Sequence, residues 1–95
     1  MTELSFTCEV HRHTTTLTVH GNVETDRTET LGDAIAMASI MRSRGPIVVD
    51  VTDVGRLSPA ALAVLRRATN DAGAAGRQLT VRAGAPALRQ AAGVA

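Results

Sequence analysis

Three residues near the middle of the chain have side chains that could form a ligand site. Asp50 lies in a run of β-branched residues, Asp53 follows it closely, and Ser58 precedes a helical pattern. Open α/β sheets bind ligands at the carboxyl ends of their strands, so this set would suit a metal ion or a phosphate group. The alternative, which we favour, is that the two carboxylates accept hydrogen bonds from backbone N–H groups of the loop.

A second set of possible ligands, Cys8, His11 and His13, lies near the N-terminus. Thiolate and imidazole groups bind zinc, and two histidines two residues apart share one face of a strand. A zinc site needs a further ordered ligand, and the sequence holds no Cys-x-x-Cys pair. A solvated turn is therefore the expected structure of this segment.

Nucleophilic catalysis has little support in the sequence. Ser58 lacks the flanking glycines of a strained nucleophile elbow, and His20 is the only histidine outside the predicted N-terminal turn. Glycines occur singly rather than in a loop that cradles phosphate. We predict that the protein is not an enzyme and that it has no cofactor and no metal ion.

Composition narrows the classes of partner. The ten basic residues are all arginines, scattered among nine carboxylates, and Phe6 is the single aromatic residue. Nucleic-acid binding normally needs clustered positive charge and, for single strands, aromatic residues for stacking, so we expect no nucleic acid. Cys8 is the only cysteine, which favours a reducing cytoplasm. No apolar run has the length of a membrane span, and the first ten residues lack a signal-peptide pattern.

Hydrophobic periodicity predicts one α/β domain over residues 1–95. A hairpin is expected from the β-rich segments 4–10 and 14–20, with a break at Gly21-Asn22. Apolar residues at helical spacing then predict a helix over about 27–43 (Leu31, Ala34, Ile35, Ala38, Met41) and another over 58–75 (Ala61, Leu62, Leu65, Ala68, Ala72). Residues 47–51 form a β-branched run typical of a strand buried on both faces, and 52–57 are expected to be a loop.

The last elements complete the predicted topology. Leu79-Thr80-Val81 is expected to be a short strand, and 86–92 a short helix with Pro86 in its first turn. Strands and helices alternate after the hairpin, which implies parallel strands joined by right-handed crossovers. We therefore predict a mixed, mostly parallel sheet with helices packed against it, in which the hairpin supplies the antiparallel part.

The order of these motifs resembles the STAS domain, the fold of bacterial anti-sigma-factor antagonists. Gly21-Asn22-Val23-Glu24 stands where the family has a Gly-x-Leu-Asp pattern before its first helix. The segments 47–52, 61–65 and 75–79 correspond to the family's buried strand, second helix and last strand entry. The resemblance covers nearly the whole chain. It implies the STAS fold and a role in binding a regulatory protein.

The chain departs from the family pattern where the second helix begins. Relatives open this helix with Asp-Ser-Ser/Thr-Gly, and an anti-sigma factor that is also a kinase phosphorylates the first serine. Here the four positions are Ser58-Pro59-Ala60-Ala61, so Pro59, which has no hydroxyl, occupies the acceptor position. We interpret Ser58 as an N-cap and Pro59 as the first helical residue. Phosphorylation of Ser58, shifted by one residue, is the alternative that we disfavour.

By this resemblance, the partner-binding surface surrounds the start of the second helix. Its expected members are Glu24, Asp53, Gly55, Arg56, Ser58, Pro59, Ala60, Arg66 and Arg67. For Arg66 and Arg67, an ordinary solvated helix face is an equally good interpretation. For Ser58 and Pro59, capping of the helix alone is the interpretation that we favour.

The leading hypothesis is a cytoplasmic regulator that binds a serine-kinase type of anti-sigma factor without a serine switch. One alternative is a STAS adaptor subunit of a transport or sensory complex. Another is a domain that senses a small ligand or nucleotide at the ends of the strands. A homodimer also stays open, because the predicted hairpin offers an exposed edge strand.

Overall fold

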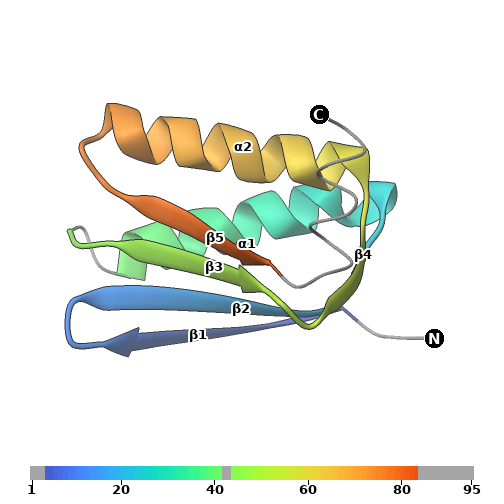
Figure 1. The fold of residues 1–95 in the computed structure, drawn as a ribbon, viewed down its shortest axis with the longest axis horizontal. Coiled ribbons are helices and arrows are strands. Elements are labelled where there is room, and N and C mark those ends of the chain that lie inside the picture. The colour runs from blue at the N-terminus through green and yellow to red at the C-terminus, as the bar shows by residue number, and fades with distance from the viewer. Residues whose placement is uncertain (1–3, 42–43, 84–95) are drawn as a thin grey trace.

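The computed structural model describes residues 4–41 and 44–83, which form a mixed sheet and two long helices (Figure 1). The strand order is β1-β2-β3-β5, and β4 pairs with β2 beyond the end of β3. The elements are β1 (Ser5–His11), β2 (Thr14–Val23), η1 (Thr25–Arg27), α1 (Thr28–Met41), β3 (Ile47–Val51), β4 (Val54–Leu57), α2 (Pro59–Ala74) and β5 (Leu79–Ala83). The predicted mixed α/β fold is confirmed, whereas the predicted helix 86–92 lies outside the described residues.

The N-terminal hairpin is confirmed. β1 and β2 pair antiparallel without interruption from Ser5 opposite His20 to His11 opposite Thr14. The two-residue turn places Arg12 at a φ of 57°, in the left-handed region that a tight hairpin turn requires. The hairpin therefore has one defined register over its whole length.

The predicted break at Gly21-Asn22 is wrong, because β2 continues to Val23. Gly21 has a φ of 100°, which a residue with a side chain rarely adopts, and the register with β4 shifts between Gly21 and Val23. The glycine thus allows an irregularity inside the strand. Beyond this point β2 has a new partner.

That partner is β4, in a segment that we predicted to be a loop. Gly21 pairs with Val54 and Val23 with Leu57, in parallel. Val54 and Leu57 are buried, while the two residues between them are exposed. Four residues with only two apolar positions give a weak sequence pattern, and pairing with the end of β2 supplies the stabilisation that the pattern does not reveal.

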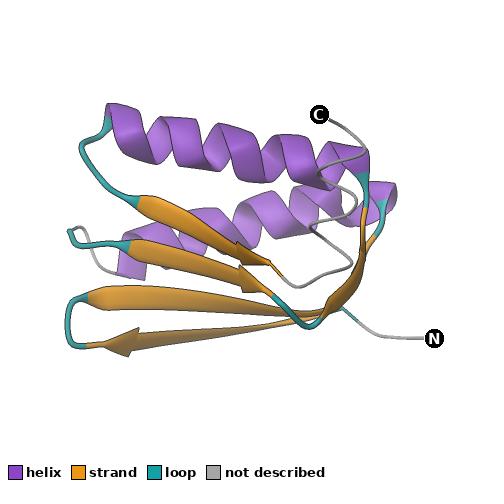
Figure 2. Cartoon of the chain, in the orientation of Figure 1, coloured by secondary structure: helices purple, strands orange, loops and turns teal. Residues whose placement is uncertain are grey.

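Both helices lie on the same side of the sheet, so the molecule has two layers (Figure 2). Burial alternates along β2 and β3: Leu17, Val19 and Val49 face the helices and are buried, whereas Val48 and Asp50 face the other side and are half-buried. The prediction that the strand at 47–51 is buried on both faces is therefore wrong. Its β-branched residues favour a strand because of their high β-propensity, although one face of this strand meets solvent.

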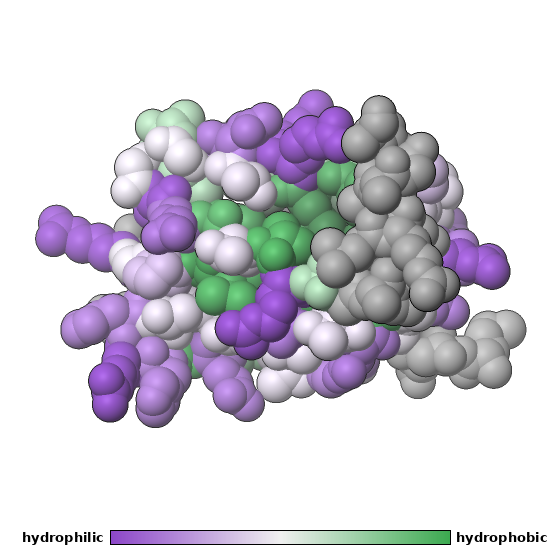
Figure 3. Space-filling model, viewed as in Figure 1, coloured by the Kyte–Doolittle hydropathy of each residue, from purple (hydrophilic) through white to green (hydrophobic). Residues whose placement is uncertain are grey.

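The core forms where the two helices meet the helix-facing side of the sheet. α1 contributes the buried residues Leu31, Ile35 and Ala38, and α2 contributes Ala61 and Leu65. In Figure 3, apolar side chains are gathered in the middle of the molecule, below the hydrophilic outer side of α2. A thin aliphatic core of this kind agrees with the nearly complete lack of aromatic residues.

Met41 is the exception among the residues predicted to form the buried stripe of the first helix. Its exposed fraction is 53%. Counting at 100° per residue, Met41 lies on the flank of α1 that faces away from α2, and not on the sheet-facing stripe. In the described part of the chain, neither helix is long and apolar enough to cross a membrane.

The substitution Leu31→Ala is expected to lower the free energy of unfolding by about 2–5 kcal/mol, since Leu31 is fully buried between helix and sheet. Urea denaturation monitored by circular dichroism measures this change. Thr30→Ala, at the exposed neighbouring position, is the control and is expected to change stability by no more than about 0.5 kcal/mol. Equal effects of the two substitutions would contradict the assigned core.

Candidate functional site

Ser58 caps the start of α2. Its side-chain Oγ accepts a hydrogen bond from the backbone N–H of Ala61 at 3.1 Å, and Pro59 is the first residue of the helix. This geometry satisfies one of the unpaired N–H groups of the first turn, and proline has no N–H to satisfy there. The predicted capping role of Ser58 is confirmed. The side chain is also enclosed, because only 7% of the residue is exposed.

The start of α2 is tied to the end of β2. The backbone N–H of Ser58 donates to the carbonyl oxygen of Val23 at 2.9 Å, and that of Leu62 donates to the Ser58 carbonyl at 3.0 Å. Pairing of β4 with the last part of β2 holds the preceding segment. The helix start is therefore held by the sheet and does not depend on a free loop for its position.

Exposed charged side chains lie near both ends of β4, the strand that leads into this helix start. Arg56 in β4 lies 3.6 Å from the Glu24 carboxylate, which comes from the segment after β2. Asp53, in the turn before β4, lies 3.3 Å from Nδ1 of His20. Such exposed pairs contribute little to stability, so their charged groups are available to a partner.

Gly55 lies where two segments approach each other closely. A Cβ atom at this position would stand 3.0 Å from Oδ1 of Asn22, which is tighter than ordinary contact. A side chain here would push against the Asn22 amide at the point where β4 pairs with β2. A glycine at position 55 avoids this close contact between β4 and β2.

The structure separates Arg66 from Arg67. Arg66 follows Pro59 by seven residues, so both lie on the outward face of α2, about 10 Å apart along the axis. Ala60, which is half-buried, precedes Arg67 by seven residues and therefore shares a different flank with it. Arg67 instead lies on the flank that faces α1, where it lines a groove. Of the two predicted arginines, only Arg66 therefore continues the surface around the helix start.

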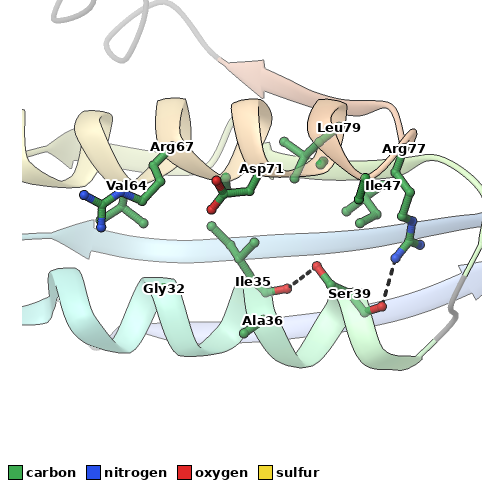
Figure 4. A pocket seen from close by; sticks show the side chains of 13 residues that line it. Gly32, Ile35, Ala36, Ser39, Ile47, Val64, Arg67, Asp71, Arg77 and Leu79 are labelled. Carbon is green, nitrogen blue, oxygen red and sulfur yellow. Dashed lines mark hydrogen bonds between the residues drawn. The ribbon is translucent and has the colours of Figure 1, made fainter.

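The groove between α1 and α2 has a cavity volume of about 370 Å³ (Figure 4). Ile35, Val64 and Leu79 give it an apolar lining, and Arg67 and Asp71 come from α2 at its rim. Sequence reasoning missed it. The only signal was the small residues on the facing flanks, Gly32 and Ala36 on α1 and Ala68 and Ala72 on α2, which leave space between the helices.

Arg77 was also missed, although it joins distant segments at the other end of α2. Its guanidinium donates to the carbonyl oxygens of Ser39 at 2.9 Å, Gly45 at 3.1 Å and Arg44 at 3.4 Å. Figure 4 shows the bond to Ser39. These acceptors lie at the end of α1 and before β3, where carbonyl groups have no partner within the helix. Arg77 is therefore structural.

The three residues considered for a metal or phosphate site do not come together. Asp50 accepts hydrogen bonds from the Thr52 backbone N–H at 2.9 Å and from the Thr52 hydroxyl, and it lies 3.6 Å from Arg82. Asp53 pairs with His20, and the Ser58 hydroxyl faces Ala61. The interpretation that Asp50 satisfies a loop backbone donor is confirmed. Each of the three side chains has a different local partner.

The geometry also separates the residues considered for zinc. Cys8 lies on the helix-facing side of β1, where burial raises the pKa of its thiol, whereas His11, an odd number of residues away, lies on the opposite side. Among residues 4–41 and 44–83, no three histidine, cysteine or carboxylate side chains gather to hold a metal ion.

A two-layer mixed sheet of this topology is shared with several solved structures. An anti-sigma factor antagonist from Mycobacterium paratuberculosis superposes with a TM-score of 0.83 at 22% identity, over 97% of this chain and 77% of that one. The antagonist SpoIIAA in its unphosphorylated form gives 0.70 at 15% identity, over 92% and 80% of the two chains. The STAS domain of an antisigma-factor antagonist from Rhodobacter sphaeroides gives 0.67 at 16% identity, over 83% and 85%.

Sequence comparison identifies the family. The model described as "Mlab, STAS domain" matches residues 6–95, so the chain belongs to the STAS domain family. Comparison with curated protein sequences gives no match. The family suspected from the order of the sequence motifs is therefore confirmed.

Replacing the capping hydroxyl is expected to weaken the fold. Ser58→Ala removes the acceptor of the Ala61 N–H and should lower the free energy of unfolding by about 1 kcal/mol, within a range of about 0.5–2 kcal/mol. Ser58→Thr keeps a hydroxyl and should lose less. Chemical denaturation of the three proteins measures the order, and a Ser58→Ala protein as stable as the parent would contradict the capping role.

The environment of Asp50 predicts a dependence of stability on pH. The hydrogen bond from the Thr52 hydroxyl lowers the pKa of Asp50 below its ordinary value of 3.8, and the Thr52 N–H and Arg82 act in the same direction. Because the folded-state pKa is depressed, the carboxylate contributes its full stabilisation above the unfolded-state pKa and loses it as the pH falls through the folded-state pKa.

Unfolding free energies measured from neutral pH down into this acidic range test the prediction. Asp50→Asn is expected to lower stability at neutral pH and to remove part of the fall at acidic pH. Asp71→Asn, at an exposed position of α2, is the control for the loss of one negative charge. An unchanged pH profile in Asp50→Asn would contradict the assignment.

Proposed function

We propose that this protein is a non-enzymatic regulator that binds a partner protein through the surface around the start of α2. We call this the helix-start surface, and it consists of Glu24, Asp53, Gly55, Arg56, Pro59, Ala60 and Arg66. Ser58 is buried next to this surface, and Arg67 lines the neighbouring groove. The proposed partner is an anti-sigma factor of the serine-kinase type, and the proposed location is the bacterial cytoplasm.

The observation that carries this proposal is the rigid anchoring of an exposed charged surface. The Ser58 cap, its bond to Val23 and the pairing of β4 position the start of α2 before any partner arrives. A surface that is already ordered loses less conformational entropy on binding. Arginine is also enriched at protein interfaces, and Arg56 and Arg66 are exposed here. The solved structures named above as anti-sigma factor antagonists support this kind of partner.

We further propose that this regulator binds without a phosphorylation switch. Pro59 occupies the position that corresponds to the phosphoacceptor serine of relatives, and it has no hydroxyl. The neighbouring hydroxyl of Ser58 is nearly enclosed and accepts the Ala61 N–H. Adding a phosphate to Ser58 would replace the capping geometry and bring a group with up to two negative charges into that enclosed space. Without a phosphoacceptor at this surface, the proposed regulator binds its partner protein constitutively.

A binding experiment tests the surface. A candidate kinase-type anti-sigma factor is incubated with the protein and ATP, and the complex and any phosphate transfer are measured by calorimetry and mass spectrometry. We expect a complex without transfer. Arg56→Glu should weaken it about tenfold or more, because the substitution reverses a charge at the interface.

Arg82→Glu is the matched control for that substitution. Arg56 and Arg82 have side chains exposed by 67% and 65%, and each lies 3.6 Å from a carboxylate oxygen, but Arg82 is in β5 and lies with Asp50 on the sheet face away from the helices. We expect Arg82→Glu to bind like the parent protein. Equal losses in the two variants, or no complex with any such anti-sigma factor, would overturn the proposed surface.

The substitution Pro59→Ser examines the missing switch in the same assay. It places a hydroxyl at the first residue of α2, where the helix N-terminus favours a phosphate. We expect the kinase to phosphorylate this variant and the complex to weaken, while the parent protein stays unmodified. Phosphorylation of the parent at Ser58 would show that the switch is present in shifted form.

A second candidate function is that of a STAS adaptor subunit in a transport or sensory complex. The favouring observation is Pro59 itself, since an adaptor needs no acceptor hydroxyl. Purification from the native cell distinguishes the two: an adaptor should copurify with transport or sensory subunits, a regulator with an anti-sigma factor. Ligand sensing at the strand ends has less support, because Asp50, Asp53 and Ser58 each have separate partners.

A further inference from the structure

The exposed large apolar side chains of the described residues gather at one end of the molecule. They are Val10, Met37, Ile40 and Met41, with exposed fractions of 41%, 65%, 75% and 53%. Val10 lies near the end of β1, and the other three lie in the last turns of α1. In Figure 1 both of these segments end on the left, opposite the start of α2. This patch is therefore separate from the helix-start surface.

The side of α1 that carries the two methionines follows from its other contacts. Leu31, Ile35 and Ala38 face the sheet, and Gly32, Ala36 and Ser39 line the groove with α2. At 100° per residue, Met37 and Met41 lie on the opposite flank, and Ile40 points away from the sheet. Because α1 packs mainly over β2, this flank overlooks β1.

The helix-facing side of β1 is also apolar. Phe6, Cys8 and Val10 stand opposite Val19, Leu17 and Thr15 of β2, which face the helices and are buried. Their β1 partners are less covered: Phe6 and Cys8 are half-buried and Val10 is exposed. In the described part of the chain, the helix layer does not extend beyond β2, so the apolar, helix-facing side of β1 is only partly covered. We call this side of β1, with Phe6, Cys8 and Val10, the apolar step.

The backbone of β1 is unpaired on its outer side within the described structure, because β2 is its partner there and β1 ends the strand order. Natural edge strands are usually protected by lysine, proline, bulges or covering segments. The seven residues of β1 hold no lysine, arginine or proline, and their register with β2 is continuous. Apart from Glu9, which lies on the face away from the helices, this edge lacks the usual protection against pairing with another strand.

We propose that the protein forms a symmetric dimer in which β1 pairs antiparallel with β1 of a second copy. A two-fold axis perpendicular to the sheet would continue the sheet through both molecules and keep both helix layers on one side. Apolar Phe6, Cys8 and Val10 alternate with polar residues in β1. In every antiparallel register that keeps both helix layers on one side of the sheet, the apolar residues of one copy therefore stand opposite apolar residues of the other. The strand is thus self-complementary.

The methionines suit the gap that this arrangement leaves between helices. Two α1 helices that each lie over β2 would be about three strand spacings apart, roughly 14 Å. Helices in direct contact are about 8–10 Å apart, so the remaining space needs long side chains. Met37 and Met41 extend from α1 toward this space, and the unbranched methionine side chain adapts to irregular gaps.

The exposed area is sufficient for a dimer. Val10, Met37 and Met41, the three that face the proposed second copy, together present on the order of 300 Å² of apolar surface, within the range of patches that mark interaction sites. A standard interface buries about 800 Å² on each partner, somewhat more than half of it apolar. With Phe6, Cys8 and the strand edge added, the patch supplies most of what a second copy needs.

Sedimentation equilibrium and light scattering over a concentration series test the dimer. We expect the parent protein to dimerise and Met37→Glu to dissociate at least about tenfold more readily, because the interface would hold the new charge once in each copy. Ala63→Glu, at an exposed position of α2, makes the same change in charge and should leave the dimer intact. Circular dichroism checks that both variants are folded.

Hydrogen exchange locates the contact. In the dimer, additional amides of β1 should be protected, and this protection should disappear in Met37→Glu while the amides of β3 stay protected in both proteins. A parent protein that is monomeric up to about 1 mM, a weak limit for association, would overturn the proposal. A dimer whose dissociation constant is unchanged in Met37→Glu would also overturn it. The same holds if the patch around Met37 binds a different protein and not a second copy of this chain.

Discussion

Strand β2 pairs with three other strands, and the rest of the structure depends on this pairing. Its first part lies between β1 and β3, and its last residues pair with β4 after the irregularity at Gly21. Leu17, Val19 and Val23 on its helix-facing side are buried in the core. Because one strand positions the hairpin, the central sheet and the segment before α2, a shift in its register would move all three.

The end of β2 also explains the geometry of the helix-start surface. The Val23 carbonyl binds the backbone of Ser58, whose side chain then caps α2. A hydroxyl used in this way is enclosed by the helix that it stabilises, and the next residue, Pro59, contributes a fixed φ in place of a hydroxyl. The same two residues that give the helix a well-defined start therefore remove an accessible serine from it.

Within the described residues, α1 and α2 do not cover the whole sheet, and the uncovered parts have different chemistry. The face away from the helices has polar and β-branched residues such as Asp50 and Val48, which are half-buried and partly in contact with water. The step along β1 is apolar on the helix side and has an open strand edge. In Figure 1 β1 lies at the bottom of the sheet and α2 at the top, and β1 ends on the side opposite the start of α2. Two partners could thus be bound without competition.

The sequence by itself determined the family, the alternation of strands and helices, and the Ser58-Pro59 helix start, because caps, glycines and apolar periodicity act over a few neighbouring residues. Only the tertiary structure decided that β2 continues through Gly21, that 54–57 is a strand and that the strand at 47–51 is open on one face. It also decided the roles of Arg77 and Met41. These features arise from contacts between segments far apart in the chain, and such contacts leave no periodic pattern within either segment.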